Sequence, residues 1–338
     1  MTTLESRETK VWTGCYGSYG LWCPDSYAHP AKMSPGLCFR IFEHLKELGW
    51  LKDNPTVLDC MGRIGTTALV ACSLGLKAVT VELEPKFVAL QQKNKEYLKA
   101  KIYKTLDWTI LQGDSRDLSQ ILSEKGLITV MSPPYENSDN RKVGSALIKK
   151  DGKRRFHEGW QEGYGLSAGQ IGQEQSESYL SAMSQVYSEI AKVSNVLVIV
   201  LKNPTRNGKL RRLDLDTIAI LEVTGWTIHC THKATLLEEN ETQDLFGQKH
   251  TKVKGRMSFF KRLSYQKGHP VAQWEDVIFA IREGNGFISV TSPPYAEALM
   301  GGGINKSGYM NTGKINASYT VESHGHTHGQ IGNLRDRV

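Results

Sequence analysis

The sequence lacks closely spaced cysteine pairs. Its 338 residues contain six cysteines with no C-x-x-C pattern: Cys15, Cys23, Cys38, Cys60, Cys72 and Cys230. Disulfide-rich secreted domains and most cysteine zinc sites need such spacing. We therefore predict no bound metal and a reduced, cytoplasmic compartment.

Long apolar runs and a secretory leader pattern are also lacking. No apolar stretch reaches the roughly 18 residues that a membrane span needs. The first residues do not show the basic and then apolar order of a signal peptide. We therefore expect a soluble protein without a membrane partner. Positive charge is in excess: 42 Lys and Arg residues against 35 Asp and Glu residues give a formal net charge of +7, which favours an anionic partner.

Short β-branched runs alternate with helical segments over residues 36–283. This alternation predicts an α/β fold: a doubly wound, mostly seven-stranded Rossmann-like sheet with helices on both faces and ligands at the carboxyl ends of the strands. We expect the helix at 36–49 to precede the first strand. The expected strands are residues 56–61, 77–85, 108–114, 126–135, 195–203, 227–236 and 274–283, and the other expected helices are 66–75, 87–101, 177–193 and 215–226.

The chain contains a partial internal repeat. "KGLITVMSPPY" at 125–135 corresponds to "NGFISVTSPPY" at 285–295, and "GQIG" recurs at 169–172 and 329–332 with the same spacing. We therefore divide the chain into a catalytic domain, 1–283, and an accessory or partly disordered repeat, 284–338. A single strand with its loop cannot bury a face alone, so the repeat would dock on the sheet, dock on another chain, or stay disordered.

The motif Ser132-Pro133-Pro134-Tyr135 follows one expected strand. Two consecutive prolines neither continue a helix nor donate to a sheet ladder, so the chain leaves its strand abruptly. Together with "HPAKMS", "LDCMGRIGTT", "VELEP" and "GDSRD" in that order, the motif resembles the amino-methylating DNA methyltransferases. These enzymes transfer a methyl group from S-adenosylmethionine to the exocyclic nitrogen of cytosine or adenine. The resemblance covers roughly residues 27–283, and serine in the first position is more similar to the N4-cytosine branch.

The resemblance implies that this tetrad is catalytic. An exocyclic amine is a poor nucleophile because its lone pair conjugates with the ring. The Ser132 hydroxyl and the Pro133 carbonyl would accept the amine hydrogens, and Pro134 would help to fix their geometry before reaction. Tyr135 would stack on a base flipped out of the duplex.

The resemblance also implies a binding site for S-adenosylmethionine. Asp59 and the turn after it would hold the methionine end, Glu82 the ribose hydroxyls and Asp114 the adenine amine. Lys32 and Ser34 would close over the methionine carboxylate, although helix capping and surface roles suit them nearly as well. The full set is Lys32, Ser34, Asp59, Met61, Gly62, Gly65, Thr66, Thr67, Glu82 and Asp114.

The turn departs from the family pattern at one position. Arg63 stands where the family has the first glycine of its Phe-x-Gly-x-Gly turn. If this position needs a positive φ or backbone contact with the cofactor, arginine is costly there. The sequence leaves the effect of Arg63 on cofactor affinity open.

Basic residues are concentrated after the first Ser-Pro-Pro-Tyr motif. We expect this loop, 136–172, to contact phosphates of double-stranded DNA; for any single lysine, a solvated surface role is the better expectation. The expected contacts are Arg141, Lys142, Lys149, Lys150, Lys153, Arg154 and Arg155. A second wall is expected from Arg206, Lys209, Arg211, Arg212, Lys252, Lys254, Arg256, Lys261 and Arg262.

Several functions remain open at this stage. Besides N4-cytosine methylation in DNA, they are N6-adenine methylation, RNA or protein glutamine methylation, and a catalytically weak nucleic-acid-binding homologue. The basic loop argues against a protein substrate. A homodimer and a cognate restriction endonuclease are further expected partners that the sequence does not decide.

Overall fold

The computed structural model describes residues 9–15, 17–28, 33–52, 54–134, 136, 167–174, 176–206, 208–235, 237–243, 249–255, 268, 270 and 272–282. For residues 28, 173, 206, 237–243 and 249–255 it describes the backbone alone. Contacts divide the chain into Met1–Phe287 and Ile288–Val338, and every described residue belongs to the first unit. The repeat at 284–338 therefore lies outside the described residues, and its accessory role stays a prediction.

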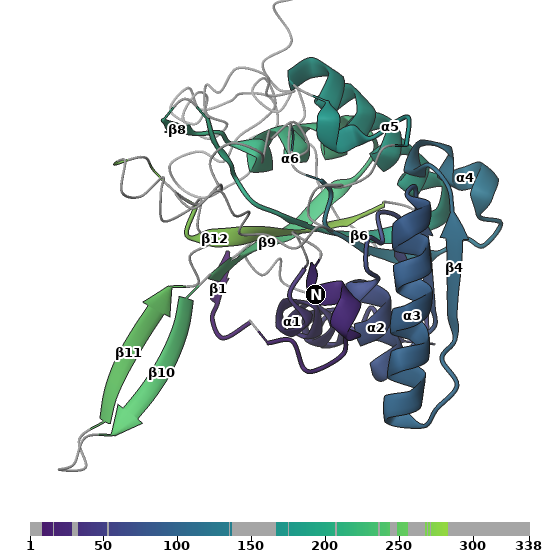
Figure 1. The fold of residues 1–338 in the computed structure, drawn as a ribbon. Coiled ribbons are helices and arrows are strands. Elements are labelled where there is room, and N and C mark those ends of the chain that lie inside the picture. Colours follow the sequence, from purple (N-terminus) through teal and green to yellow (C-terminus); the bar gives the residue numbers. More distant parts are fainter. Residues whose placement is uncertain are drawn as a thin grey trace, which may run out of the picture. The chain divides into compact units, whose positions relative to one another are not determined.

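An eight-stranded sheet forms the centre of this unit (Figure 1). Within it only β12 runs antiparallel to its neighbours, so the predicted mostly parallel α/β fold is confirmed. In order across the sheet, the strands are β1 (Lys10–Trp12), β9 (Thr227–Thr235), β12 (Trp274–Ile281), β6 (Ser194–Leu201), β5 (Leu127–Met131), β2 (Val57–Asp59), β3 (Ala78–Glu82) and β4 (Trp108–Gln112).

All seven expected strands are present in the sheet, and β1 adds an eighth at the edge beside β9. The expectation that a helix precedes the first strand is wrong, because β1 precedes α1. With only three residues, β1 is too short to show an alternating pattern. Its backbone pairing with β9, from Lys10 opposite His232 to Trp12 opposite Ala234, is what places it in the sheet.

Helices cover both faces of the sheet, as predicted. The apolar side chains of α1 (Pro35–Glu47), α2 (Thr66–Ser73) and α3 (Pro85–Ile102) pack in one buried cluster, and those of α4 (Leu118–Ile121), α5 (Ser176–Val193) and α6 (Leu213–Val223) pack in another. Figure 1 shows α1 and α2 on one side of the sheet and α5 and α6 on the other. In β6, Val196 and Val198 belong to the first cluster, whereas Leu197 and Ile199 belong to the second. A strand buried on both faces needs such a continuous apolar run.

Shorter elements complete the described chain. A hairpin of β10 (Leu237–Gln243) and β11 (Lys249–Gly255) and a small pair, β7 (Thr205–Arg206) with β8 (Lys209–Leu210), each form a separate antiparallel sheet. Short 3-10 turns lie at Pro24–Ala28, Ser115–Asp117 and Ile171–Gln173. Among the described helices, none is both long and apolar enough to traverse a bilayer.

The strand order reverses between β2 and β5. From β2 the chain builds outward through β3 and β4, whereas β5 and β6 lie on the other side. Because these strands are parallel, their carboxyl ends meet at one edge, and the crevice at such a reversal is where α/β sheets bind ligands.

Candidate active site

Asp59 ends β2 and holds the turn that follows it. One carboxylate oxygen accepts the Met61 backbone N–H at 3.1 Å, and the other accepts the Thr67 hydroxyl at 2.8 Å. The side chain is buried, and burial raises its pKa to about 6. Asp59 therefore connects the strand to the first turn of α2.

Two glycines let the turn pass close to other elements. Gly65 has φ +81°, and a Cβ there would meet the Trp108 ring at 2.5 Å. A Cβ on Gly62 would meet Gln91 Nε2 at 2.8 Å. A larger side chain would displace the turn at either position, which explains the glycines in this motif.

Arg63 adopts the left-handed conformation that the family pattern suggests for a glycine, with φ +46°. Its backbone N–H donates to Glu82 Oε2 at 2.6 Å, and its carbonyl accepts from Gln91 Nε2 at 2.9 Å. A non-glycine residue in this region costs about 1–2 kcal/mol, which two hydrogen bonds of about 1 kcal/mol each can offset. The turn is thus formed despite the departure.

Glu82 and Asp114 follow the next two strands. Both Glu82 oxygens accept backbone N–H groups, from Arg63 and, at 2.9 Å, from Glu84, while burial raises the pKa of the carboxyl. Burial opposes ionisation of Asp114, but hydrogen bonds from Arg116, including Nη2 at 2.5 Å, outweigh it and lower the pKa. Asp114 is therefore held as an anion at the tip of β4.

The Ser-Pro-Pro tip after β5 lies beside this turn. Ser132 lines the same cleft as Asp59, and Pro134 lines a second cleft with Glu82 and Asp114. The Tyr179 hydroxyl of α5 donates to the Pro134 carbonyl at 3.0 Å, which fixes the tip. The chain segments that the sequence placed at strand ends are therefore brought together.

The two clefts adjoin one another. Met61 and Arg63 line both of them, and the clefts hold about 20 Å³ and about 60 Å³ of space. In the first cleft, the Thr66 hydroxyl is buried without a hydrogen-bond partner among the described residues, as expected of a group that a ligand would satisfy.

The other expected site residues have varied positions. Thr67 supports the turn through its hydrogen bond to Asp59, and Gly65 does so through its close approach to Trp108. The Ser34 hydroxyl donates to the Cys15 carbonyl at 3.1 Å. Its neighbour Met33 lines the first cleft. The proposed ligand roles of all these residues stay predictions. Lys32, Tyr135, Arg141, Lys142, Lys149, Lys150, Lys153, Arg154 and Arg155 lie outside the described residues.

Two members of the second basic group are paired within the chain. Arg211 forms ion pairs with Glu136, at 2.6 Å, and with Asp216, and Arg212 pairs with Asp214 at 2.7 Å. These partners reduce the charge that either arginine offers to a phosphate. The expected second wall is therefore weaker at these two positions than the sequence suggests.

Sequence reasoning missed part of the second cleft. Gly169, Gln170 and Ile171 line it, together with Leu83 and Phe87. The recurrence of "GQIG" at a fixed distance from both Ser-Pro-Pro-Tyr motifs was the available signal. It indicated a shared structural unit, but not which face of the sheet that unit would meet.

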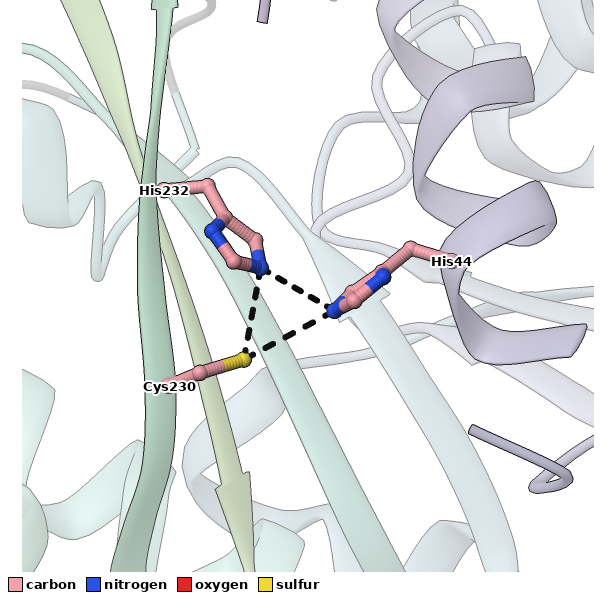
Figure 2. Close-up of side chains that lie close together, drawn as sticks. All are labelled: His44, Cys230 and His232. Atoms are coloured by element: carbon pink, nitrogen blue, oxygen red, sulfur yellow. Dashed lines mark hydrogen bonds between the residues drawn. The ribbon is translucent and has the colours of Figure 1, made fainter. Parts of the chain in front are cut away.

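A separate buried cluster contains His44 of α1 with Cys230 and His232 of β9 (Figure 2). The two Nε2 atoms lie 3.0 Å apart, and Cys230 Sγ lies 3.7 Å and 3.4 Å from those of His44 and His232. These separations suit three ligands of a tetrahedral metal as well as they suit hydrogen bonds. Which ring nitrogens carry hydrogen therefore decides between a metal site and a hydrogen-bonded cluster.

Hydrogen bonds account for the cluster without a metal. The Lys10 backbone N–H donates to His232 Nδ1 at 3.1 Å, so a neutral His232 carries its hydrogen on Nε2 and donates to His44. His44 then donates from Nδ1 to Glu47 at 2.8 Å. A metal ligand would need the Nε2 lone pair of His232. The three residues thus do not fit a metal in this arrangement.

The sequence matches no protein-family model and no curated protein. Similar solved structures include a candidate RNA methyltransferase from Pyrococcus horikoshii, with 12% identity, a TM-score of 0.42, and coverage of 79% of this chain and 92% of that one. Magnesium protoporphyrin IX methyltransferase from Synechocystis PCC 6803, with bound SAH, has 12% identity and a TM-score of 0.40, with coverage of 74% of this chain and 83% of that one. Precorrin 8W decarboxylase from Methanobacterium thermoautotrophicum has 9% identity and a TM-score of 0.40, with coverage of 77% of this chain and 96% of that one. Similarities this weak do not decide this chain's chemistry.

Proposed function

We propose that the chain is an S-adenosylmethionine-dependent methyltransferase that acts on the exocyclic amine of a flipped base in double-stranded DNA, with N4 of cytosine as the favoured target. The observation that carries the proposal is the shared cleft of Ser132 and Asp59. It joins the motif expected to hold the acceptor to the turn expected to hold the donor. The cleft lies at the reversal of strand order.

The residues present suit the cofactor chemically. Glu82 offers remaining carboxylate lone pairs to ribose hydroxyls at the end of β3, and the ionised Asp114 offers an acceptor to an adenine amine. The Thr66 hydroxyl in the other cleft, which has no hydrogen-bond partner within the described part of the chain, suits the polar methionine end. When bound, S-adenosylmethionine would supply an electrophilic methyl group on its sulfonium.

The protein's own task is to position the acceptor amine. The Ser132 hydroxyl and the Pro133 carbonyl would each accept one amine hydrogen, leaving the nitrogen lone pair directed at the methyl group. The Tyr179 bond to Pro134 keeps this tip rigid, so the orientation is set before reaction. The cysteines near the site have raised pKa values because of burial, and the proposal assigns none of them a nucleophilic role.

The test is transfer of labelled methyl groups to plasmid DNA, followed by nucleoside analysis. Ser132→Ala is expected to lower the rate constant about 10²-fold, as for other positioned hydrogen-bond groups, with little change in S-adenosylmethionine affinity. Ser119→Ala, in α4, is the matched control and is expected to keep the wild-type rate. Label in RNA or protein alone, or a Ser132→Ala variant as fast as wild type, would contradict the proposal; N6-methyladenine would redirect it.

A further inference from the structure

The segment Ser167–Gln173 lies beside the ends of β3 and β4, although it is far from both in sequence. Within it, Gly169, Gln170 and Ile171 line the second cleft together with residues that include Glu82 and Asp114. From the sequence, residues 167–172 are expected to belong to the loop that contacts DNA. Its position in the structure indicates a different task.

Polar contacts fasten this segment to the sheet. Glu84, which is 4% exposed, accepts the Ser167 backbone N–H at 2.9 Å and also the Gln170 side-chain amide. Arg116 Nη2 donates to the Gly169 carbonyl at 3.2 Å while the same guanidinium holds Asp114. The segment is therefore fixed to the same framework that orients the Asp114 carboxylate.

Gly169 allows this close approach. Its φ is +90°, and a Cβ would lie 3.1 Å from Asp114 Oδ2 and in collision with Arg116 Nη2. Any other residue would be strained at this φ and would displace the Arg116 guanidinium that holds Asp114. The glycine of the repeated "GQIG" motif thus has a specific packing reason at this site.

We propose that Gly169–Ile171 forms the outer wall of a purine-nucleoside subsite. This inference rests on the proposed function and deepens it, because it assigns the motif to the donor instead of to DNA. A purine nucleoside has flat apolar faces and a polar edge with ribose hydroxyls. The second cleft offers apolar side chains from Leu83, Phe87 and Ile171 and carboxylates from Glu82 and Asp114.

Binding measurements on the full chain test this assignment, with adenosine and S-adenosylmethionine as separate probes. Ile171→Ala is expected to weaken the binding of both ligands about tenfold, because it removes an apolar wall around the nucleoside that the two ligands share. Thr66→Val is expected to weaken the binding of S-adenosylmethionine and leave the affinity for adenosine unchanged, since Thr66 lies in the other cleft. Ile218→Ala, in α6 and away from the clefts, controls for general loss of packing.

The outcomes separate the two proposals. If wild type binds both probes and Ile171→Ala binds them equally well, the wall assignment is wrong and the methyltransferase proposal stands. If wild type binds neither probe, both are wrong. If Ile171→Ala weakens S-adenosylmethionine but not adenosine, the segment lies against another part of the donor and the nucleoside assignment is overturned.

Discussion

Arg63 shows how a single residue can depart from a pattern and still keep its backbone geometry. With φ +46° it lies where glycine is favoured, held by hydrogen bonds to Glu82 and Gln91. Its neighbours also explain why the sequence alone could not settle the matter. The family pattern indicates which conformation is needed, but only the structure shows the contacts that make arginine acceptable.

Paired substitutions at Arg63 isolate this backbone effect. Arg63→Gly and Arg63→Ala both remove the side chain, so their difference in unfolding free energy reports the conformation alone. We expect the glycine variant to be more stable by about 1 kcal/mol, because alanine is disfavoured at positive φ. Chemical denaturation measures this. Lys99 is exposed within α3 and is the control position: there the glycine variant is expected to be less stable than the alanine variant by about 1 kcal/mol. If the alanine variant is the more stable one at Arg63 as well, the backbone explanation is wrong.

Some strands and helices can be predicted from the sequence, and others cannot. β6 can be predicted from the sequence because burial on both faces requires a continuous apolar run. α1 and α5 can be predicted from the helical period of their apolar residues. The proline at the start of α3 marks its first turn. In contrast, β1 depends on its pairing with β9, a contact more than two hundred residues away, and no local pattern encodes it.

A hydrogen-bonded chain links three of these elements: β1 through Lys10, β9 through His232 and α1 through His44. Burial, followed by the neighbouring His44 and two cationic side chains, lowers the pKa of His232 to about 4 from 6.5. The unfolded chain therefore binds a proton between these values while the folded protein does not. This contribution to stability is complete above about pH 6.5 and is lost as pH falls toward 4.

His232→Asn tests this linkage, since an asparagine oxygen can still accept the Lys10 N–H. We expect the stability difference between wild type and variant to shrink by about 2 kcal/mol between pH 7.5 and pH 4.5. Burial raises the pKa of Asp59 and Asp276 to about 6, an effect of opposite sign, so the wild-type curve alone is not diagnostic. His229 is exposed on the same strand, so His229→Asn is the control and is expected to follow the wild-type pH profile of stability. A His232→Asn profile that also runs parallel to that of wild type would refute the linkage.

At the scale of the whole molecule, the site is assembled from segments that are distant in sequence. The strand ends were predictable because parallel strands bring their carboxyl ends to one edge. Glu82, Asp114 and Ser132 follow such strands, and the clefts they line adjoin one another. Gly169–Ile171 was not predictable, since its place depends on Glu84 and Arg116 contacts that leave no local pattern.

The tail repeat provides the last prediction. It repeats the Ser-Pro-Pro-Tyr and "GQIG" motifs, but the tail sequence contains no counterpart of the turn after β2, which the proposed function assigns to the donor. We therefore expect Ser292→Ala to keep the wild-type methylation rate, in contrast to Ser132→Ala, and removal of residues 284–338 to keep donor affinity. The methyl-transfer assay on plasmid DNA compares the two alanine variants directly. Loss of methylation in Ser292→Ala, with donor binding intact, would instead indicate that the tail supplies the base pocket to a partner chain.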